Sequence, residues 1–114
     1  MIEYWHNPRC SKSRQGLALL QERGADLTER RYLEDSPSLA EITAAWEALG
    51  RPPAAQMMRT GEKAFKENGL SKSDSDETLL AAMAAHPILI ERPLAISGGR
   101  AVIGRPPEAL LSLL

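Results

Sequence analysis

The sequence predicts an α/β fold in which helices cover both faces of a four-stranded mixed sheet. Three observations favour it: a strand–helix–strand order at the N-terminus, a hairpin signal in the last third of the chain, and a final helix after that hairpin. The first two strands are expected to be parallel and joined by a right-handed crossover. Layered α/β domains follow such an order. A length of 114 residues leaves room for one domain and one core, so a single domain is expected over 1–114.

The N-terminal unit is predicted from hydrophobic patterning and turn residues. Ile2–Trp5 forms a short strand, and the turn signal Asn7-Pro8 follows it. A helix is expected from Ser11 to about Arg23, because Gly24 occupies the position where helices commonly end. Thr28–Leu33 is a weaker candidate for the second strand.

Additional helices are expected between the second strand and the hairpin. Ser38 and Glu41 have the spacing of a capping box, and apolar residues at helical spacing continue to Gly50. Pro52-Pro53 then precedes a short helix over Ala54–Met58.

The stretch over residues 60–75 is polar and rich in Gly and Ser, which predicts a surface connection. Asp74–Glu77 is expected to cap a helix that continues to about Ala85, where Pro87 stops it.

The last third of the chain predicts a β-hairpin and a terminal helix. Leu94–Ser97 and Arg100–Ile103 flank Gly98-Gly99, a typical two-residue hairpin turn. Pro106-Pro107-Glu108 then begins a helix, since proline suits its first turn and Glu its positive end. The complete order is β-α-β, inserted helices, then β-β-α, which is the layout of a thioredoxin-like (glutaredoxin-like) fold.

Composition excludes several classes of function. The net charge of −1 gives no general basic surface for nucleic acid or an anionic membrane, and no apolar run approaches a membrane span. No secretory signal begins the chain, so a cytoplasmic location is expected. The single cysteine rules out an internal disulfide and a cysteine-cluster zinc site, and we expect no metal site. A monomer is expected because no uncovered apolar stripe is evident.

Cys10 is the candidate nucleophile. It lies between a predicted strand end and a predicted helix start, where free backbone amides and the helix dipole favour a thiolate and attract anions. Nearby positive charge comes from Arg9, Lys12, Arg14 and His6. The alternative is a small buried hydrophobe, but the neighbours of Cys10 are polar. Ser13 occupies the place of the second cysteine of a dithiol oxidoreductase, so a thiol from outside must resolve any oxidation.

Two arginines are predicted to face each other beyond the hairpin. With Gly98-Gly99 as the turn, Leu94 pairs with Ile103, and the same register sets Arg92 opposite Arg105. Opposed like charges destabilise a sheet, and an anion between the two guanidinium groups would convert that repulsion into a clamp. The alternative is two solvated arginines that diverge and pair with acidic neighbours. Arg59, at the end of a short helix, is by pattern alone another solvated arginine.

Four segments in order along the chain resemble the glutaredoxin-coupled arsenate reductase family. They are YWHNPRCSKSR (4–14), RYLE (31–34), HPILIERP (86–93) and IGRPPE (103–108). The resemblance covers essentially the whole chain. The best-characterised members resemble Cys-Gly-Thr-Ser at the nucleophile, whereas this chain has Cys-Ser-Lys-Ser, which places it nearer a housekeeping-like branch.

The resemblance implies a thioredoxin-like fold with extra helices and an oxidoreductase that converts arsenate, or a similar small oxyanion, to its reduced form. It implies that Cys10 attacks arsenic, that His6 lowers the Cys10 pKa, and that Arg59, Arg92 and Arg105 bind the oxyanion. Pro93 would match the cis-proline that faces the catalytic cysteine. Glutathione would be a co-substrate rather than a bound cofactor, and glutaredoxin the partner.

Two other functions remain open. A monothiol oxidoreductase that acts on glutathione mixed disulfides is compatible with Cys-x-x-Ser but needs no arginine triad. Some thioredoxin-fold relatives regulate transcription by binding RNA polymerase, and a regulator of that kind would keep the fold without turnover. The sequence does not fit a phosphatase-like arsenate reductase, because that class requires Cys-x5-Arg, whereas Cys10 and Arg14 have the spacing Cys-x3-Arg.

Overall fold

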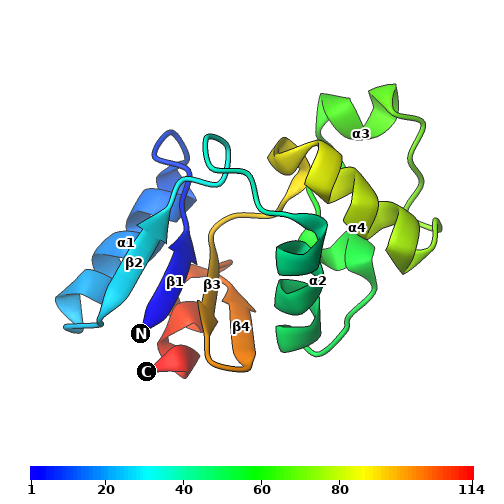
Figure 1. Cartoon of the computed structure of the whole chain (residues 1–114). Helices are drawn as coiled ribbons and strands as arrows, with labels where there is room; N and C mark the ends of the chain where they lie inside the picture. Colours follow the sequence, from blue (N-terminus) through cyan, green and yellow to red (C-terminus); the bar gives the residue numbers. More distant parts are fainter. The chain divides into compact units, whose positions relative to one another are not determined.

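The computed structural model describes all 114 residues and divides them into two compact units (Figure 1). The first unit consists of Met1–Asp35 together with Arg92–Leu114, and the second of Ser36–Glu91. The expectation of one domain over 1–114 stays a prediction. No helix combines the length and apolar character needed to cross a bilayer.

The first unit contains the predicted four-stranded mixed sheet. Its strands are β1 (Ile2–Trp5), β2 (Leu27–Arg30), β3 (Leu94–Ser97) and β4 (Arg100–Ile103). Their order in the sheet is β2-β1-β3-β4, with β1 parallel to β2 and both other pairs antiparallel. The predicted hairpin register is confirmed from Leu94↔Ile103 to Ser97↔Arg100. Gly98 adopts a φ of 60°, which a residue with a side chain adopts less readily.

One face of this sheet is covered by α1 (Ser11–Glu22) and the C-terminal 3₁₀ helix η3 (Pro107–Leu113). Ile2 and Tyr4 alternate along β1 and so point to the same face, where they pack with Leu20 of α1 and Leu110 of η3. The apolar patterning of β1 and of the C-terminal segment therefore builds a single core, and this core fixes α1 against the sheet.

The predicted second strand at Thr28–Leu33 was placed too far along the chain. β2 spans Leu27–Arg30 because it must stay in register with β1, and the ladder ends where the His6 N–H donates to the Arg30 carbonyl at 2.7 Å. The chain then turns, and the Arg31 carbonyl accepts the N–H groups of Glu34 and Asp35.

The second unit is helical. Its α-helices are α2 (Leu39–Ala48), α3 (Lys63–Glu67) and α4 (Asp76–Ala85), and its 3₁₀ helices are η1 (Ala54–Met57) and η2 (Pro87–Leu89). The capping box is confirmed: Glu41 N–H donates to Ser38 Oγ at 3.1 Å, and Ser38 N–H donates to Glu41 Oε1 at 3.0 Å. Ser75 caps α4, within the predicted Asp74–Glu77 signal.

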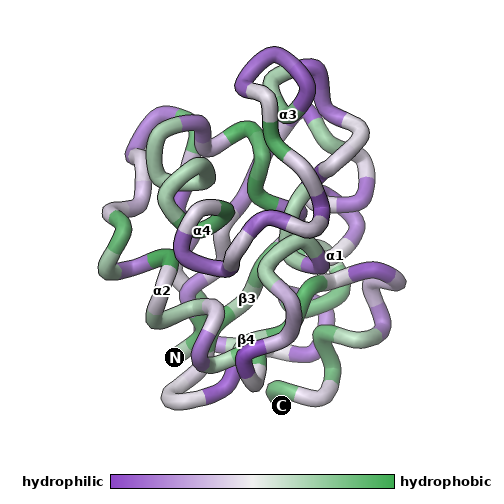
Figure 2. Tube along the Cα trace, turned by 90° about the vertical axis from the view of Figure 1, so that its right-hand side faces the viewer, coloured by the Kyte–Doolittle hydropathy of each residue, from purple (hydrophilic) through white to green (hydrophobic).

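Residues 60–75 are more structured than predicted, because they contain α3. Figure 2 shows hydrophilic colouring around α3. Because a short polar segment has no helical period of apolar residues, the sequence pattern did not predict this helix. Phe65 is its one buried side chain and anchors the helix. The helix expected after Pro106 is present as the 3₁₀ helix η3.

We expect Gly16→Ala to destabilise the protein. A Cβ at residue 16 would lie 2.5 Å from the Tyr4 hydroxyl and 2.7 Å from Leu110 Cδ1, both in the packed core. Overpacking of this kind typically costs about 1–3 kcal/mol, which exceeds the helical preference for alanine of about 1 kcal/mol. Urea unfolding measures the change. Gly61→Ala is the matched control, because nothing lies within 4 Å of its Cβ. Unchanged or increased stability of Gly16→Ala would contradict this packing.

Candidate active site

Cys10 is the N-cap residue of α1, as the sequence predicts. Its backbone is extended, with φ −95° and ψ 121°, and the loop before it is held by two hydrogen bonds. The Cys10 N–H donates to the Asn7 carbonyl at 3.0 Å, and the Arg9 N–H donates to Asn7 Oδ1 at 3.0 Å. The residue Cys10 is 8% exposed, so it is nearly enclosed but still within reach of solvent.

The hairpin brings Arg92 and Arg105 together beside Cys10. The register continues past β3 and β4, because the Gly104 N–H donates to the Pro93 carbonyl at 2.9 Å. Arg105 Nε then donates to the Arg92 carbonyl at 2.8 Å, and Arg105 Nη2 donates to Cys10 Sγ at 3.8 Å. The Arg92–Pro93 peptide bond is cis, as the family resemblance implies for Pro93.

The electrostatic setting lowers the pKa of Cys10. Burial is the largest single influence and opposes ionisation, because it removes water from the thiolate. The backbone N–H of Ser13, the guanidinium of Arg92 and the backbone N–H of Lys12 together outweigh it. Free amides at a helix N-terminus and a neighbouring cation are the conditions under which thiols become reactive.

Ser13 connects β1, the Cys10 loop and α1. Its hydroxyl accepts the Asn7 N–H at 3.0 Å and lies 2.7 Å from His6 Nδ1, and its carbonyl accepts the Tyr4 hydroxyl at 2.7 Å. Ser13 and Tyr4 are fully buried and His6 is 5% exposed. This network holds the residues of the loop in one arrangement beneath the thiol.

Burial lowers the pKa of His6, and the charges of Arg31 and Arg14 add to that effect against an opposing influence from Glu29. The imidazole is therefore neutral at pH 7, so it adds no full positive charge there. Its role in lowering the Cys10 pKa stays a prediction. Arg14 contributes to the loop, since its Nη1 donates to the Pro8 carbonyl at 2.8 Å.

Arg59 belongs to the second unit, so its predicted meeting with the oxyanion at Cys10 stays a prediction. It follows η1, and its N–H donates to the Leu89 carbonyl at 2.8 Å. Its side chain is 29% exposed and forms an ion pair with Glu62, which is not the solvated arginine that pattern alone suggests. Glu62 is not evident as a partner from the sequence, because the i,i+3 spacing indicates ion pairs on helices, whereas Arg59 and Glu62 lie in the turn between η1 and α3.

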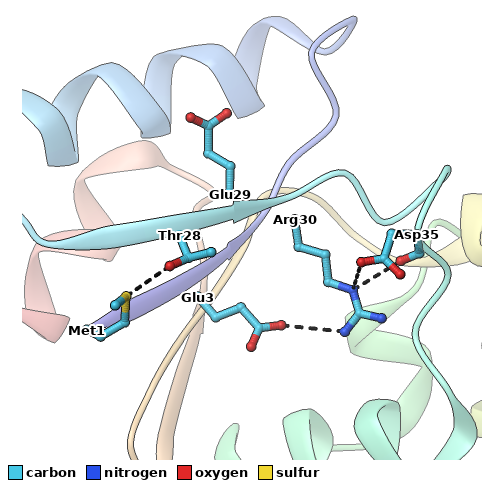
Figure 3. A pocket seen from close by; sticks show the side chains of 6 residues that line it. All are labelled: Met1, Glu3, Thr28, Glu29, Arg30 and Asp35. Carbon is cyan, nitrogen blue, oxygen red and sulfur yellow. Dashed lines mark hydrogen bonds and ion pairs between the residues drawn. The ribbon is translucent and has the colours of Figure 1, made fainter.

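A cavity at the β2 edge of the sheet is lined by charges of both signs, unlike the pair of arginines at Cys10. Figure 3 shows this cavity, with Arg30 directed toward Glu3 and Asp35. Arg30 Nη1 lies 3.6 Å from Glu3, and Arg30 Nε lies 3.4 Å from Asp35. Because these charges neutralise one another, the cavity offers no comparable anion site.

Fold and site together define a thioredoxin-like protein with a lone cysteine at a helix N-terminus and two arginines beside it. Comparison with known proteins identifies the family within this class. The model of the ArsC family matches residues 5–113, and the chain belongs to that family.

Named relatives cover nearly the whole chain. An arsenate reductase of Neisseria meningitidis serogroup A is 43% identical over 114 residues, with 99% of this chain and 97% of the relative covered. An arsenate reductase of Haemophilus influenzae is 42% identical over 111 residues, with 96% of each covered. The solved structure of an arsenate reductase from Vibrio cholerae has a TM-score of 0.93 at 46% identity, with 99% of this chain and 97% of that chain covered.

We expect Cys10 to be alkylated at lower pH than an ordinary thiol. Its pKa is lowered, so the thiolate is present below the usual midpoint of about pH 8.5. The pH midpoint of the rate of reaction with iodoacetamide should be lowered to the same extent. Arg92→Gln should move the midpoint upward, because a cation beside the sulfur is lost.

Arg100→Gln, on the exposed start of β4, is the matched control and should leave the midpoint unchanged. Circular dichroism verifies that each variant is folded. A wild-type midpoint at or above that of an ordinary thiol would contradict the electrostatic account.

Proposed function

We propose that this protein is an arsenate reductase that uses the Cys10 thiolate as nucleophile and takes its electrons from glutathione and glutaredoxin. The observation that carries the proposal is the position of Arg92 and Arg105 at the sulfur, with Arg105 Nη2 3.8 Å from Cys10 Sγ. Guanidinium forks match the paired oxygens of a tetrahedral oxyanion.

A thiolate that attacks an anion must overcome repulsion between two negative charges. Cations fixed beside the sulfur before the substrate arrives reduce that repulsion without rearrangement during the reaction. In this proposal, Arg92 and Arg105 hold the arsenate oxygens while Cys10 forms a sulfur–arsenic bond and hydroxide or water leaves. Arg59 is proposed as a third ligand to the same oxygens.

The electron balance requires outside thiols. Reduction of arsenate to arsenite takes up two electrons, and the net reaction is arsenate plus two thiols giving arsenite, one disulfide and water. Cys10 is the only cysteine of the chain, so it cannot form an internal disulfide and return unaided to the thiolate. Glutathione forms a second sulfur–arsenic bond in the Cys10 adduct and displaces water. A glutaredoxin thiol then takes the glutathionyl sulfur as a mixed disulfide, which leaves its two electrons on arsenic, and water cleaves the Cys10 sulfur–arsenic bond to release arsenite and the Cys10 thiol.

A coupled assay tests the proposal. Arsenate-dependent NADPH oxidation is followed with glutathione, glutaredoxin and glutathione reductase present. We expect Cys10→Ser to abolish turnover and Arg105→Gln to lower kcat/KM for arsenate by about 10²–10³-fold, the size of effect seen when one preorganised oxyanion donor is removed. Arg100→Gln should retain wild-type activity.

Further measurements test the redox partner separately from the reaction on arsenate. Replacing the glutathione system with thioredoxin and its reductase tests the coupling, and turnover only with thioredoxin would overturn the glutathione part. Arsenate should slow alkylation of Cys10. Absence of turnover in both systems, combined with reduction of glutathione mixed disulfides, would replace arsenate reduction with a monothiol oxidoreductase function.

A further inference from the structure

A small cavity opens beside the Cys10 loop, at the carboxyl ends of the parallel strands β1 and β2. Its volume is about 180 Å³. It is lined by His6, Asn7, Pro8, Arg9, Arg31, Leu33 and Glu34. The first four residues connect β1 to Cys10, and the other three form the turn after β2. The carboxyl ends of parallel strands are a common place for ligands in α/β proteins.

The charges of this cavity are not neutralised by one another. The side chains of Arg9, Arg31 and Glu34 are exposed and make no hydrogen bond, and none of them lies within ion-pair distance of an opposite charge. This contrasts with the cavity of Figure 3, where Arg30 pairs with Glu3 and Asp35. Two cations and one anion around one small cavity form a pattern that can bind a ligand end group carrying both signs.

The size of the cavity limits its occupant. Its volume of about 180 Å³ is below the roughly 300–1,000 Å³ of pockets that hold a whole drug-sized ligand. It suits a single end group, such as the carboxylate and ammonium on one carbon of an α-amino acid. The side chain of Leu33, 42% exposed, offers an apolar surface for the methylene groups next to such an end.

The cavity is also within reach of the thiol. Arg9 directly precedes Cys10, and consecutive Cα atoms are about 3.8 Å apart. Asn7, another lining residue, accepts the Cys10 N–H at 3.0 Å. A peptide thiol extends about 3.3–3.6 Å per residue, so its sulfur can meet the Cys10 adduct while an end group one or two residue lengths away occupies the cavity.

We propose that this cavity binds the γ-glutamyl end of the peptide thiol that reduces the Cys10 adduct. Arg9 and Arg31 hold its α-carboxylate, and Glu34 holds its ammonium group. The inference rests on the proposed function for its chemical purpose, and it adds a binding site that separates the reductant from the oxyanion at Arg92 and Arg105.

A binding measurement tests the site without turnover. Amide chemical shifts of the ¹⁵N-labelled protein are followed during titration with S-methylglutathione, which cannot react. We expect the shifts to concentrate at residues 7–9 and 31–34, and Arg31→Gln to weaken binding about 10- to 100-fold, as the loss of a charge-assisted contact predicts. Arg100→Gln is the matched control and should bind like the wild type. Shifts confined to other parts of the chain would overturn the site.

Kinetics with modified thiols identify which end is bound. Arg31→Gln should raise the KM for glutathione and leave the KM for arsenate unchanged. The same ratio of variant to wild type is expected for the glycine ethyl ester of glutathione, in which the other carboxylate is blocked. The ratio should fall to about one for cysteinylglycine, which lacks the γ-glutamyl end. Persistence of the full ratio with cysteinylglycine would overturn the proposal.

The two proposals can fail separately. The wild type could turn over arsenate while Arg9→Gln and Arg31→Gln leave the KM for glutathione unchanged. That result would overturn this site and leave the proposed reductase function intact. Absence of arsenate turnover, together with arginine-dependent shifts around the cavity, would support the thiol site and overturn the choice of oxyanion.

Discussion

The hydrogen bonds of Ser13 are the interaction on which the active-site geometry depends. The Ser13 carbonyl accepts a hydrogen bond from the Tyr4 hydroxyl, and the Ser13 hydroxyl accepts one from the Asn7 N–H. The Ser13 N–H also helps to lower the pKa of Cys10. A buried strand, a tight loop and a helix N-terminus are thereby fixed to one another. Because Ser13 is fully buried, loss of its hydroxyl would leave polar partners without compensation inside the protein.

The second constraint is the register of the β3–β4 hairpin. A two-residue turn permits one pairing, and shifting it by one residue would turn every side chain to the opposite face. The same register sets Gly104 against Pro93 and leads Arg105 to the Arg92 carbonyl and the Cys10 sulfur. The repulsion expected between two opposed arginines is offset in part by these acceptors.

Those elements of the fold with strong local signals were predictable from the sequence. The Gly98-Gly99 turn, the Ser38–Glu41 capping box and the apolar strand Ile2–Trp5 each have a local cause, and each is found where predicted. The end of β2 was not predictable in this way, because it is set by pairing with β1 rather than by its own residues. α3 was missed for a related reason, since one buried Phe65 gives no period.

For the site too, features with a local cause were predictable and features that depend on distant segments were not. Cys10 at a helix start and Arg92 opposite Arg105 follow from local pattern and register, and the structure brings these three together. The ion pair of Arg59 with Glu62 and the cavity around Arg9 and Arg31 depend on how loops fold, which no short pattern encodes.

The same cations serve both the thiolate and, in the proposed function, the oxyanion, and this sharing has a consequence for the reaction. A thiolate partly satisfies Arg92 and Arg105, so an anion that binds between them competes with it for positive charge. Linkage requires the effect to be mutual: a bound oxyanion raises the Cys10 pKa, and an ionised Cys10 weakens oxyanion binding. A strongly lowered pKa would also make the sulfur a weaker nucleophile. In the proposed function, the burial of Cys10, which opposes ionisation, limits this loss of nucleophilicity.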